Sequence, residues 1–391
     1  MKEVLEGNSA VAEAVRLARV QVVAAYPITP QSHIAEVISD YCATGKMDAR
    51  YLRVESEHSC LASLVGAACG GVRTFTATSS AGLAYMHEML HWVAGSRLPI
   101  VMAEVNRAVG APWNIWADQT DSLSQRDTGW IQLYCEDGQE VFDTVLQAFR
   151  LAEWVNLPVM VVTEGFLLSH TYEPVDVPDQ ETVDRFLPPY NPAFMLDTKK
   201  PYTLNSITPP SAYMEIRHDN ALAMDQALER FNAVEDEFEA LFNRRHGPVE
   251  VISCDDAEII LVTSGTITST ARVLLEELRG GGERVGVLKM KMFRPFPVEL
   301  VRSVLRRAKK LAVIDRNLSS GIGGIFAQEV RAALCNMPDP PLVFGYIAGL
   351  GGRDVTTGVL KDIYQRTKDS NTPSNKSIWI GLQEVKHAFG R

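Results

Sequence analysis

Glu57 is the residue whose surroundings point most directly to chemistry. It stands in a short loop with Glu55, ahead of a predicted helix rich in small residues and a strand that ends in a Ser-Ser-Ala-Gly turn at residues 79–82. Small residues let a helix pack closely on its neighbours, so an acid here could be fixed in a dry cleft for a cofactor. A glutamate in a first helical turn is also a common cap that matches the helix dipole, and the local pattern alone favours that use.

Thr29 is a second candidate. It belongs to the segment Tyr-Pro-Ile-Thr-Pro at residues 26–30, which follows an apolar stretch and precedes a predicted helix at residues 31–41. Pro27 and Pro30 stiffen the backbone that presents the Thr29 hydroxyl. A loop between a buried strand and a helix lies at the carboxyl edge of a parallel sheet, where such sheets bind ligands. A plain helix N-cap region is an equally good interpretation of these residues.

Arg107 lies just past the segment 98–105, a predicted buried strand that ends in Asn106-Arg107. An arginine there can hold a carboxylate with two parallel hydrogen bonds, but it could equally pair with Glu104 or Asp118. The loop that follows is rich in tryptophan and charge, and long loops of this kind are usually functional. Packing of the loop is the simplest use of the rings of Trp113 and Trp116.

The composition describes a globular protein with two α/β domains. The chain has 391 residues, 46% hydrophobic residues and a formal net charge of −10, which argues against a nucleic-acid or anionic membrane surface. The N-terminus lacks a signal pattern, and no window reaches the roughly 18 apolar residues of a membrane span. The six cysteines are scattered without a C-x-x-C pair, which is typical of reduced thiols in a cytoplasmic protein and predicts no metal or iron–sulfur site on this chain.

Alternating apolar strands and amphipathic helices predict three regions. Residues 1–173 read as a parallel-sheet domain, with strands at 20–25, 73–78, 98–105 and 157–162 and helices at 8–19, 31–41, 86–93 and 139–155. Residues 174–248 read as a proline-rich extended connector followed by a helix at 220–242. Residues 249–391 read as a second, smaller parallel sheet, with strands at 258–263, 285–289 and 310–315.

Two tempting motifs fail. The glycine-rich segment at 320–324 lacks the G-x-G-x-x-G spacing of a dinucleotide site. The pair Asp137-Gly138 has Glu136 where a diphosphate-binding Gly-Asp-Gly would need glycine.

Several stretches agree on one family. In chain order the sequence resembles the α subunit of multi-subunit pyruvate:ferredoxin oxidoreductases and related 2-oxoacid oxidoreductases. The residues that carry this resemblance run over nearly the whole chain: YPITP at 26–30, ESEH at 55–58, TATSSAGL at 76–83, Asn106-Arg107, RDTGW at 126–130, FRPF at 293–296 and AGLGG at 348–352.

The resemblance implies a pyrimidine-type thiamine diphosphate domain followed by a domain like the C-terminal domain of transketolase. In this family the cofactor lies between two subunits. Glu57 would bind ring nitrogen N1′ of the aminopyrimidine, with Pro27, Ile28 and Ser80 also at the cofactor. The Thr29 hydroxyl would bind the substrate and Arg107 its carboxylate.

The resemblance also implies partners. A β subunit would bind the diphosphate, its Mg²⁺ and an iron–sulfur (4Fe-4S) cluster, and further clusters would lie on γ and δ subunits that resemble ferredoxin. Electrons would pass to ferredoxin, and coenzyme A would take the acyl group. The missing Gly-Asp-Gly and cysteine clusters fit that division.

The substrate stays open. Thr29 favours pyruvate, whereas the Trp113 and Trp116 loop could suit a larger 2-oxoacid such as phenylglyoxylate or 2-oxoisovalerate; oxalate and 2-oxoglutarate are the other options. Two readings from other classes are a transketolase-like transferase half and a scaffold subunit without catalysis. Whether Glu57 or Glu55 meets the cofactor is also open.

Overall fold

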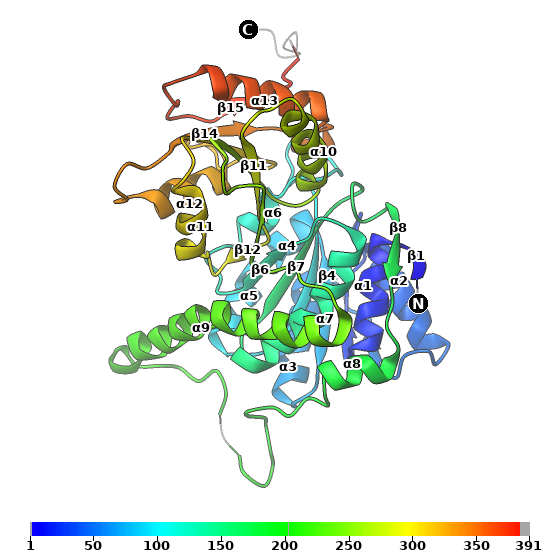
Figure 1. The fold of residues 1–391 in the computed structure, drawn as a ribbon. Helices are drawn as coiled ribbons and strands as arrows, with labels where there is room; N and C mark the ends of the chain where they lie inside the picture. Colours follow the sequence, from blue (N-terminus) through cyan, green and yellow to red (C-terminus); the bar gives the residue numbers. More distant parts are fainter. Residues whose placement is uncertain (1, 202, 384–391) are drawn as a thin grey trace. The chain divides into compact units, whose positions relative to one another are not determined.

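The computed structural model describes residues 2–201 and 203–383, and the chain divides into two compact units. The first comprises the chain up to residue 250 together with Ser264–Thr266 and Met290–Pro297. The second comprises Val251–Thr263, Ile267–Lys289 and the chain from Val298 onward. Both are α/β with mostly parallel sheets, which confirms the predicted fold class (Figure 1).

The first unit is built on a seven-stranded sheet in the order β12-β6-β7-β5-β4-β2-β3. Its strands pair in parallel except β12, which runs antiparallel to β6 at the edge. Most of its central positions are buried and apolar, as expected for a parallel sheet covered on both faces. The strands are β2 (Val22–Ala24), β3 (Arg50–Leu52), β4 (Thr74–Thr78), β5 (Val101–Asn106), β6 (Ile131–Tyr134), β7 (Val159–Glu164) and β12 (Met292–Arg294).

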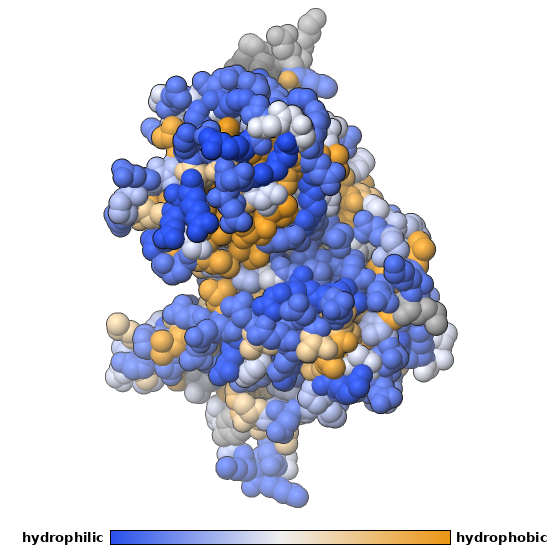
Figure 2. Space-filling view, viewed as in Figure 1, coloured by the Kyte–Doolittle hydropathy of each residue, from blue (hydrophilic) through white to orange (hydrophobic). Residues whose placement is uncertain are grey.

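Helices pack on this sheet through apolar stripes. Helix α9 is the longest; it turns Ala227, Phe231 and Phe238 into the core, while its outward side is largely hydrophilic (Figure 2). The helices are α1 (Gly7–Leu17), α2 (Ser32–Ala43), α3 (Glu57–Cys69), α4 (Ser80–Tyr85), α5 (His87–Gly95), α6 (Thr120–Leu123), α7 (Gly138–Val155), α8 (Gln180–Phe186) and α9 (Pro210–Phe242).

The structure corrects three expectations for this unit. The segment predicted as an extended connector begins with β8 (Tyr172–Asp176), which pairs antiparallel with β1 (Lys2–Glu6), and continues into α8. The single helix expected between the strands at 73–78 and 98–105, with residues 86–93 as part of it, is two helices, α4 and α5. Helix α9 begins at Pro210, ten residues before the predicted start, because proline is well suited to a first helical turn.

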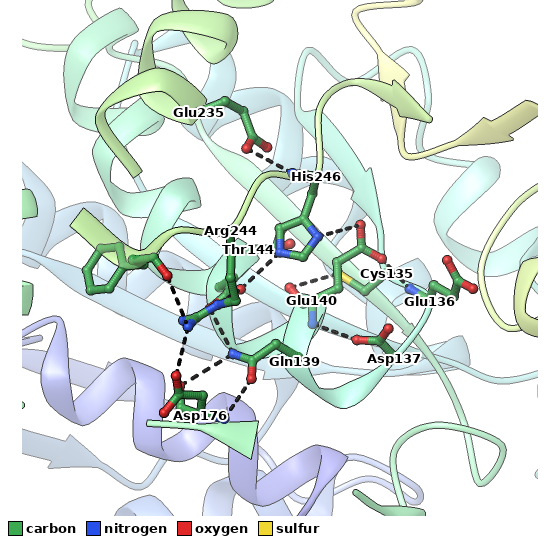
Figure 3. A network of polar contacts seen from close by, with 12 residues as sticks. Cys135, Glu136, Asp137, Gln139, Glu140, Thr144, Asp176, Glu235, Arg244 and His246 are labelled. Carbon is green, nitrogen blue, oxygen red and sulfur yellow. Dashed lines mark hydrogen bonds and ion pairs between the residues drawn. The ribbon is translucent and has the colours of Figure 1, made fainter. Parts of the chain in front are cut away.

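A polar network joins α7 to the segment that follows α9 (Figure 3). Arg244 donates from Nε and Nη2 to the two oxygens of Asp143, each at 2.8 Å, and His246 Nε2 lies 2.9 Å from Asp143 Oδ2. The buried Lys291 Nζ lies 3.3 Å from Glu140 Oε1. Asp137, from the failed diphosphate motif, caps α7 by accepting the Glu140 amide at 2.8 Å. The network therefore anchors chain segments that are distant in sequence.

The second unit carries a six-stranded sheet in the order β15-β14-β13-β10-β11-β9. Asp315, at the end of β13, accepts the amides of Phe326 and Ala327 at the start of α12. The helix N-terminus that follows the glycine-rich segment thus already holds a carboxylate of its own chain. The elements are β9 (Val249–Ile252), β10 (Ile259–Thr263), α10 (Ile267–Gly280), β11 (Val285–Met290), α11 (Val298–Leu305), β13 (Lys310–Asp315), α12 (Ile325–Leu334), β14 (Leu342–Ile347), a 3-10 turn (Leu350–Gly352), α13 (Thr357–Asp369) and β15 (Ile378–Trp379).

In the part of the chain that the structure describes, no helix is both long and apolar enough to cross a membrane.

Candidate active site

The predicted site residues follow neighbouring strands of the first sheet. The loop with Thr29 comes after β2, Ser80 comes after β4 and Arg107 comes after β5. These three strands are adjacent, and the strand order turns at β2, with β3 on one side and β4 on the other. Ligands of open α/β sheets bind at the carboxyl ends of strands at such a turning point.

Glu57 is buried without a partner of its own chain. It is the first residue of α3, but Ser56 is the N-cap, since its hydroxyl accepts the Ser59 amide at 3.3 Å. The Glu57 side chain is 8% exposed and makes no hydrogen bond or ion pair with the residues that the structure describes. A buried carboxyl group normally finds a donor, so Glu57 is suited to an external one.

Gly82, on α4, makes the seat for Glu57. A Cβ atom added to Gly82 would lie 2.7 Å from Glu57 Oε1 and 2.6 Å from Thr78 Oγ1. Real Cβ contacts are not that short, so only glycine allows α4 to approach the carboxylate this closely. The Ser-Ser-Ala-Gly turn and the acid therefore form one feature.

Glu55 has a different environment. Its side chain is exposed, and it accepts a hydrogen bond from the Ser59 hydroxyl, which lowers the pKa of Glu55. An exposed acid with a donor of its own chain is less suited than Glu57 to hold a cofactor nitrogen.

Arg107 and Thr29 lie together. Arg107 is 8% exposed, and its Nη1 donates to the Thr29 carbonyl at 2.8 Å. Its Nε is buried without a partner among the described residues, and its guanidinium lies 6.0 Å from the centre of the Trp113 ring. Neither Glu104 nor Asp118 binds this guanidinium in the described chain, so Arg107 keeps donors for a further anion.

The other predicted cofactor residues surround these two. Pro27 is exposed and Ile28 is half-buried, and the Ile28 amide donates to Gln31 Oε1 at 3.3 Å. Ser80 is buried with φ +50, and its hydroxyl donates to the Ala108 carbonyl at 2.7 Å. In the tryptophan loop Trp130 packs inside, whereas the rings of Trp113 and Trp116 are 78% and 48% exposed, so loop packing accounts for only one of the three.

Sequence reasoning missed Asp121 as the centre of this region. Its Oδ2 accepts the amides of Ser80 at 3.0 Å and Arg107 at 2.8 Å. Its Oδ1 accepts Asn106 Nδ2 at 2.7 Å. The fully buried Glu104, on β5, faces it. The signal in the sequence was Glu104, a single acid inside an apolar strand. A buried acid must find a partner, and here that partner is Asp121.

The residues present fit an aminopyrimidine and a carboxylate. Glu57 offers a buried acceptor beside Gly82, and Arg107 offers a buried Nε donor that no described residue binds. In the described residues, no group of three or more His, Cys, Asp or Glu side chains could hold a metal ion.

Two family models match the chain. Residues 13–236 match the family described as pyruvate flavodoxin/ferredoxin oxidoreductase, thiamine diphosphate-binding. Residues 257–360 match the core domain II of pyruvate:ferredoxin oxidoreductase.

Relatives cover nearly the full length. The chain is 47% identical over 384 residues to pyruvate synthase subunit PorA of Methanothermobacter thermautotrophicus, covering 98% of each chain. It is 49% identical over 370 residues to ketoisovalerate oxidoreductase subunit VorA of Pyrococcus abyssi, covering 94% of each.

A solved structure shares the fold. The 2-oxoglutarate:ferredoxin oxidoreductase from Magnetococcus marinus, with 2-oxoglutarate, coenzyme A and succinyl-CoA bound, superposes with a TM-score of 0.73 at 19% identity. The match covers 94% of this chain and 65% of that one.

Proposed function

Because the chain belongs to the pyruvate flavodoxin/ferredoxin oxidoreductase family, we propose that it is the α-type subunit of a complex that oxidatively decarboxylates pyruvate. The products are acetyl-CoA, carbon dioxide and electrons for ferredoxin, and the complex can also run in reverse. The observation that carries the proposal is the Glu57 carboxyl group, which is buried against Gly82 and has no partner among the described residues. Arg107 lies in the loop after β5 of the same unit.

Glu57 is the proposed catalytic residue. Its carboxyl group holds a proton at N1′ of the aminopyrimidine, and Pro27, Ile28 and Ser80 complete the walls of the cofactor site. When bound, thiamine diphosphate supplies the nucleophilic carbon and accepts the electrons left when carbon dioxide departs. The low exposure of Glu57 strengthens the hydrogen bond from the ring to its carboxyl group.

Arg107 and Thr29 are the proposed substrate residues. The guanidinium binds the 2-oxoacid carboxylate, and its bond to the Thr29 carbonyl fixes its direction. The Thr29 hydroxyl then lies on the same loop, available to the 2-oxo group. These roles orient the substrate, which is a large part of the rate advantage of an enzyme.

Pyruvate is our first choice of substrate, and 2-oxoisovalerate is the second. The first is favoured by the PorA relatives and the small Thr29 side chain, the second by a VorA relative of similar identity. The exposed ring of Trp113 lies beside Arg107 and could contact the larger side chain of 2-oxoisovalerate.

The proposed complex shares its site between subunits. The relatives are named as subunits, which supports a multi-subunit assembly. We assign the diphosphate, Mg²⁺ and one iron–sulfur cluster to a β subunit, further clusters to γ and δ subunits, and the acyl group to coenzyme A.

The test is anaerobic turnover of the native complex. Reduction of methyl viologen with coenzyme A is measured against pyruvate, 2-oxoisovalerate, 2-oxoglutarate, oxalate and phenylglyoxylate. We expect the highest kcat/KM with pyruvate. Preference for 2-oxoisovalerate would keep the chemistry and replace the substrate. No turnover with any 2-oxoacid, despite bound thiamine diphosphate and intact clusters, would overturn the proposal and favour a transferase or scaffold role.

Matched variants separate the two acids. Glu57→Gln should lower turnover by more than about 100-fold, the lower end of a general acid–base contribution. Glu55→Gln, two residues away and exposed, should leave turnover near the wild-type value. Near-normal turnover of Glu57→Gln with thiamine diphosphate still bound would transfer the role to Glu55.

A further inference from the structure

The carboxyl groups of Glu104 and Asp121 interact next to the candidate site, and no cation among the described residues pairs with either of them. Glu104 on β5 is fully buried, and Asp121 on α6 is 1% exposed. The charge of Asp121 and a hydrogen bond between the two side chains both act on Glu104. If both carboxyl groups were ionised, their negative charges would repel each other strongly in this buried site.

Asp121 has its full share of donors. Oδ2 accepts the Ser80 and Arg107 amides, and Oδ1 accepts Asn106 Nδ2 and the Ser122 amide at 2.8 Å. Asp121 is therefore satisfied as a carboxylate that accepts hydrogen bonds from four groups.

Glu104 is the opposite case. Neither of its oxygens accepts a hydrogen bond of normal geometry from the described residues. The Ser80 amide, which donates to Asp121, lowers the pKa of Glu104 but does not outweigh burial. A proton on Glu104 removes the repulsion and converts one of its oxygens into a donor to Asp121. Burial, then the charge of Asp121, raises the pKa of Glu104 well above its ordinary value, in agreement with this arrangement.

The other titratable groups near the pair do not compete for this proton. Tyr134 on β6 bonds Ser122 at 2.8 Å, and burial raises the pKa of its hydroxyl far above neutrality. The Arg107 guanidinium is directed to the Thr29 carbonyl, and only its backbone amide reaches Asp121. The charge of Arg294 lowers the pKa of Tyr134, but this effect does not outweigh burial.

We propose that Glu104 is a positioning residue that stays protonated and donates a hydrogen bond to Asp121, which in turn fixes the backbone of Ser80 and Arg107 at the site. This inference rests on the proposed function for the roles of those two residues. Ser80 has φ +50, a conformation that residues other than glycine adopt only when their surroundings hold them there. The Asp121 carboxylate supplies that hold and ties it to the placement of Arg107.

Two variants test the shared proton in the assembled complex. Glu104→Gln keeps a neutral donor, and Glu104→Met keeps similar bulk but has no donor. We expect Glu104→Gln to stay within about threefold of wild type in kcat and KM, and Glu104→Met to raise the KM for the 2-oxoacid by about tenfold, the scale of one hydrogen bond to a charged group. The kcat should fall less, because Asp121 binds the backbone of Ser80 and Arg107 and does not bind Glu57.

The proposed role of Glu104 is overturned if Glu104→Met retains the wild-type KM, or if Glu104→Gln and Glu104→Met raise the KM equally. An infrared difference spectrum between wild-type and Glu104→Gln complexes gives a readout without turnover. It should contain the carbonyl band of a buried protonated acid that is insensitive to pH near neutrality, and absence of this band would refute the shared proton even if Glu104→Met fails to assemble. A wild-type complex that turns over no 2-oxoacid would instead count against the proposed function.

Discussion

The first unit holds two groups of buried acids that differ in what faces them. Asp143 faces Arg244 and His246, whereas among the described residues Asp121 faces Glu104 and neutral donors. Burial alone would raise the pKa of Asp143, but hydrogen bonds from His246 and Arg244 outweigh it and the pKa is lowered. Burial raises the pKa of Asp121 to about 6, although its hydrogen bonds partly offset the shift.

The difference separates anchoring from positioning. Asp143 pairs with the Arg244 guanidinium and hydrogen-bonds the His246 ring, so it joins α7 to the chain after α9. The Glu104 and Asp121 pair carries a shared proton and controls backbone amides next to the candidate site. Buried acids therefore have different roles, anchoring or positioning, according to the residues they contact. The sequence around an acid does not reveal which residues it contacts in the fold.

Matched amide variants should separate the two groups most clearly. Asp143→Asn leaves Arg244 and His246 without their counter-charge, so we expect a loss of about 3–5 kcal/mol in the free energy of unfolding, as for breaking a buried ion pair. Glu104→Gln exchanges one neutral donor for another and should cost less than about 1 kcal/mol. Urea unfolding of the purified chain measures both. Equal losses of unfolding free energy in the two variants would contradict the difference between an anchoring Asp143 and a protonated Glu104.

A third kind of buried acid is Glu57, whose side chain pairs with neither a cation nor a second acid among the described residues. Gly82→Ala would drive a methyl group into its seat, so we expect a loss of about 1–3 kcal/mol from overpacking and weaker binding of thiamine diphosphate. The control is Gly66→Ala in α3, where an added Cβ meets nothing within 4 Å; it should be neutral or stabilising. Calorimetric titration of the complex with the cofactor measures the binding. Unchanged binding by Gly82→Ala would show that Gly82 does not shape the site.

Opposite pKa shifts give opposite responses to pH. The lowered pKa of Asp143 contributes stability that is present above its unfolded value, near 3.9, and is lost as the pH falls through its folded pKa. The raised pKa of Glu104 means that the folded chain keeps a proton that the unfolded chain releases above about pH 4.3, so stability falls as the pH rises, by up to about 1.4 kcal/mol per pH unit.

Unfolding curves at pH 5, 6 and 7 test this sign. The Glu104→Gln chain lacks the titrating group, so its stability relative to wild type should increase as the pH rises. Parallel pH dependences of the two chains would show that Glu104 is ionised in the folded state.

The smallest effect is expected at the surface. Arg150 and Glu237 form a bidentate pair, with side chains that are 28% and 40% exposed. Glu237→Gln should therefore cost less than about 1 kcal/mol, because water screens the charges. The same unfolding assay measures it, and a loss as large as that of Asp143→Asn would mean that burial is not what separates the pairs.

The sequence was sufficient for the fold class and the family, and both are confirmed. Apolar strands followed by short loops also placed Thr29, Ser80 and Arg107 at strand ends, and the structure shows that these strands are adjacent. The sites themselves stay predictions. Asp121 could not be found, because its role depends on three amides brought together by folding. The edge strand β12 was missed because it pairs with β6, about 160 residues earlier.

That edge strand has a consequence for biosynthesis. β12 reaches the first sheet only after β10 and β11 of the second unit have been made, since it follows both in the chain. When only residues 1–250 have left the ribosome, β6 is therefore an edge strand whose outer side is unpaired. Such an edge can associate with other chains. A fragment cut at residue 250 is accordingly a poor choice for expressing the first unit, and a longer chain that includes Met290–Pro297 is the smallest one that closes its sheet.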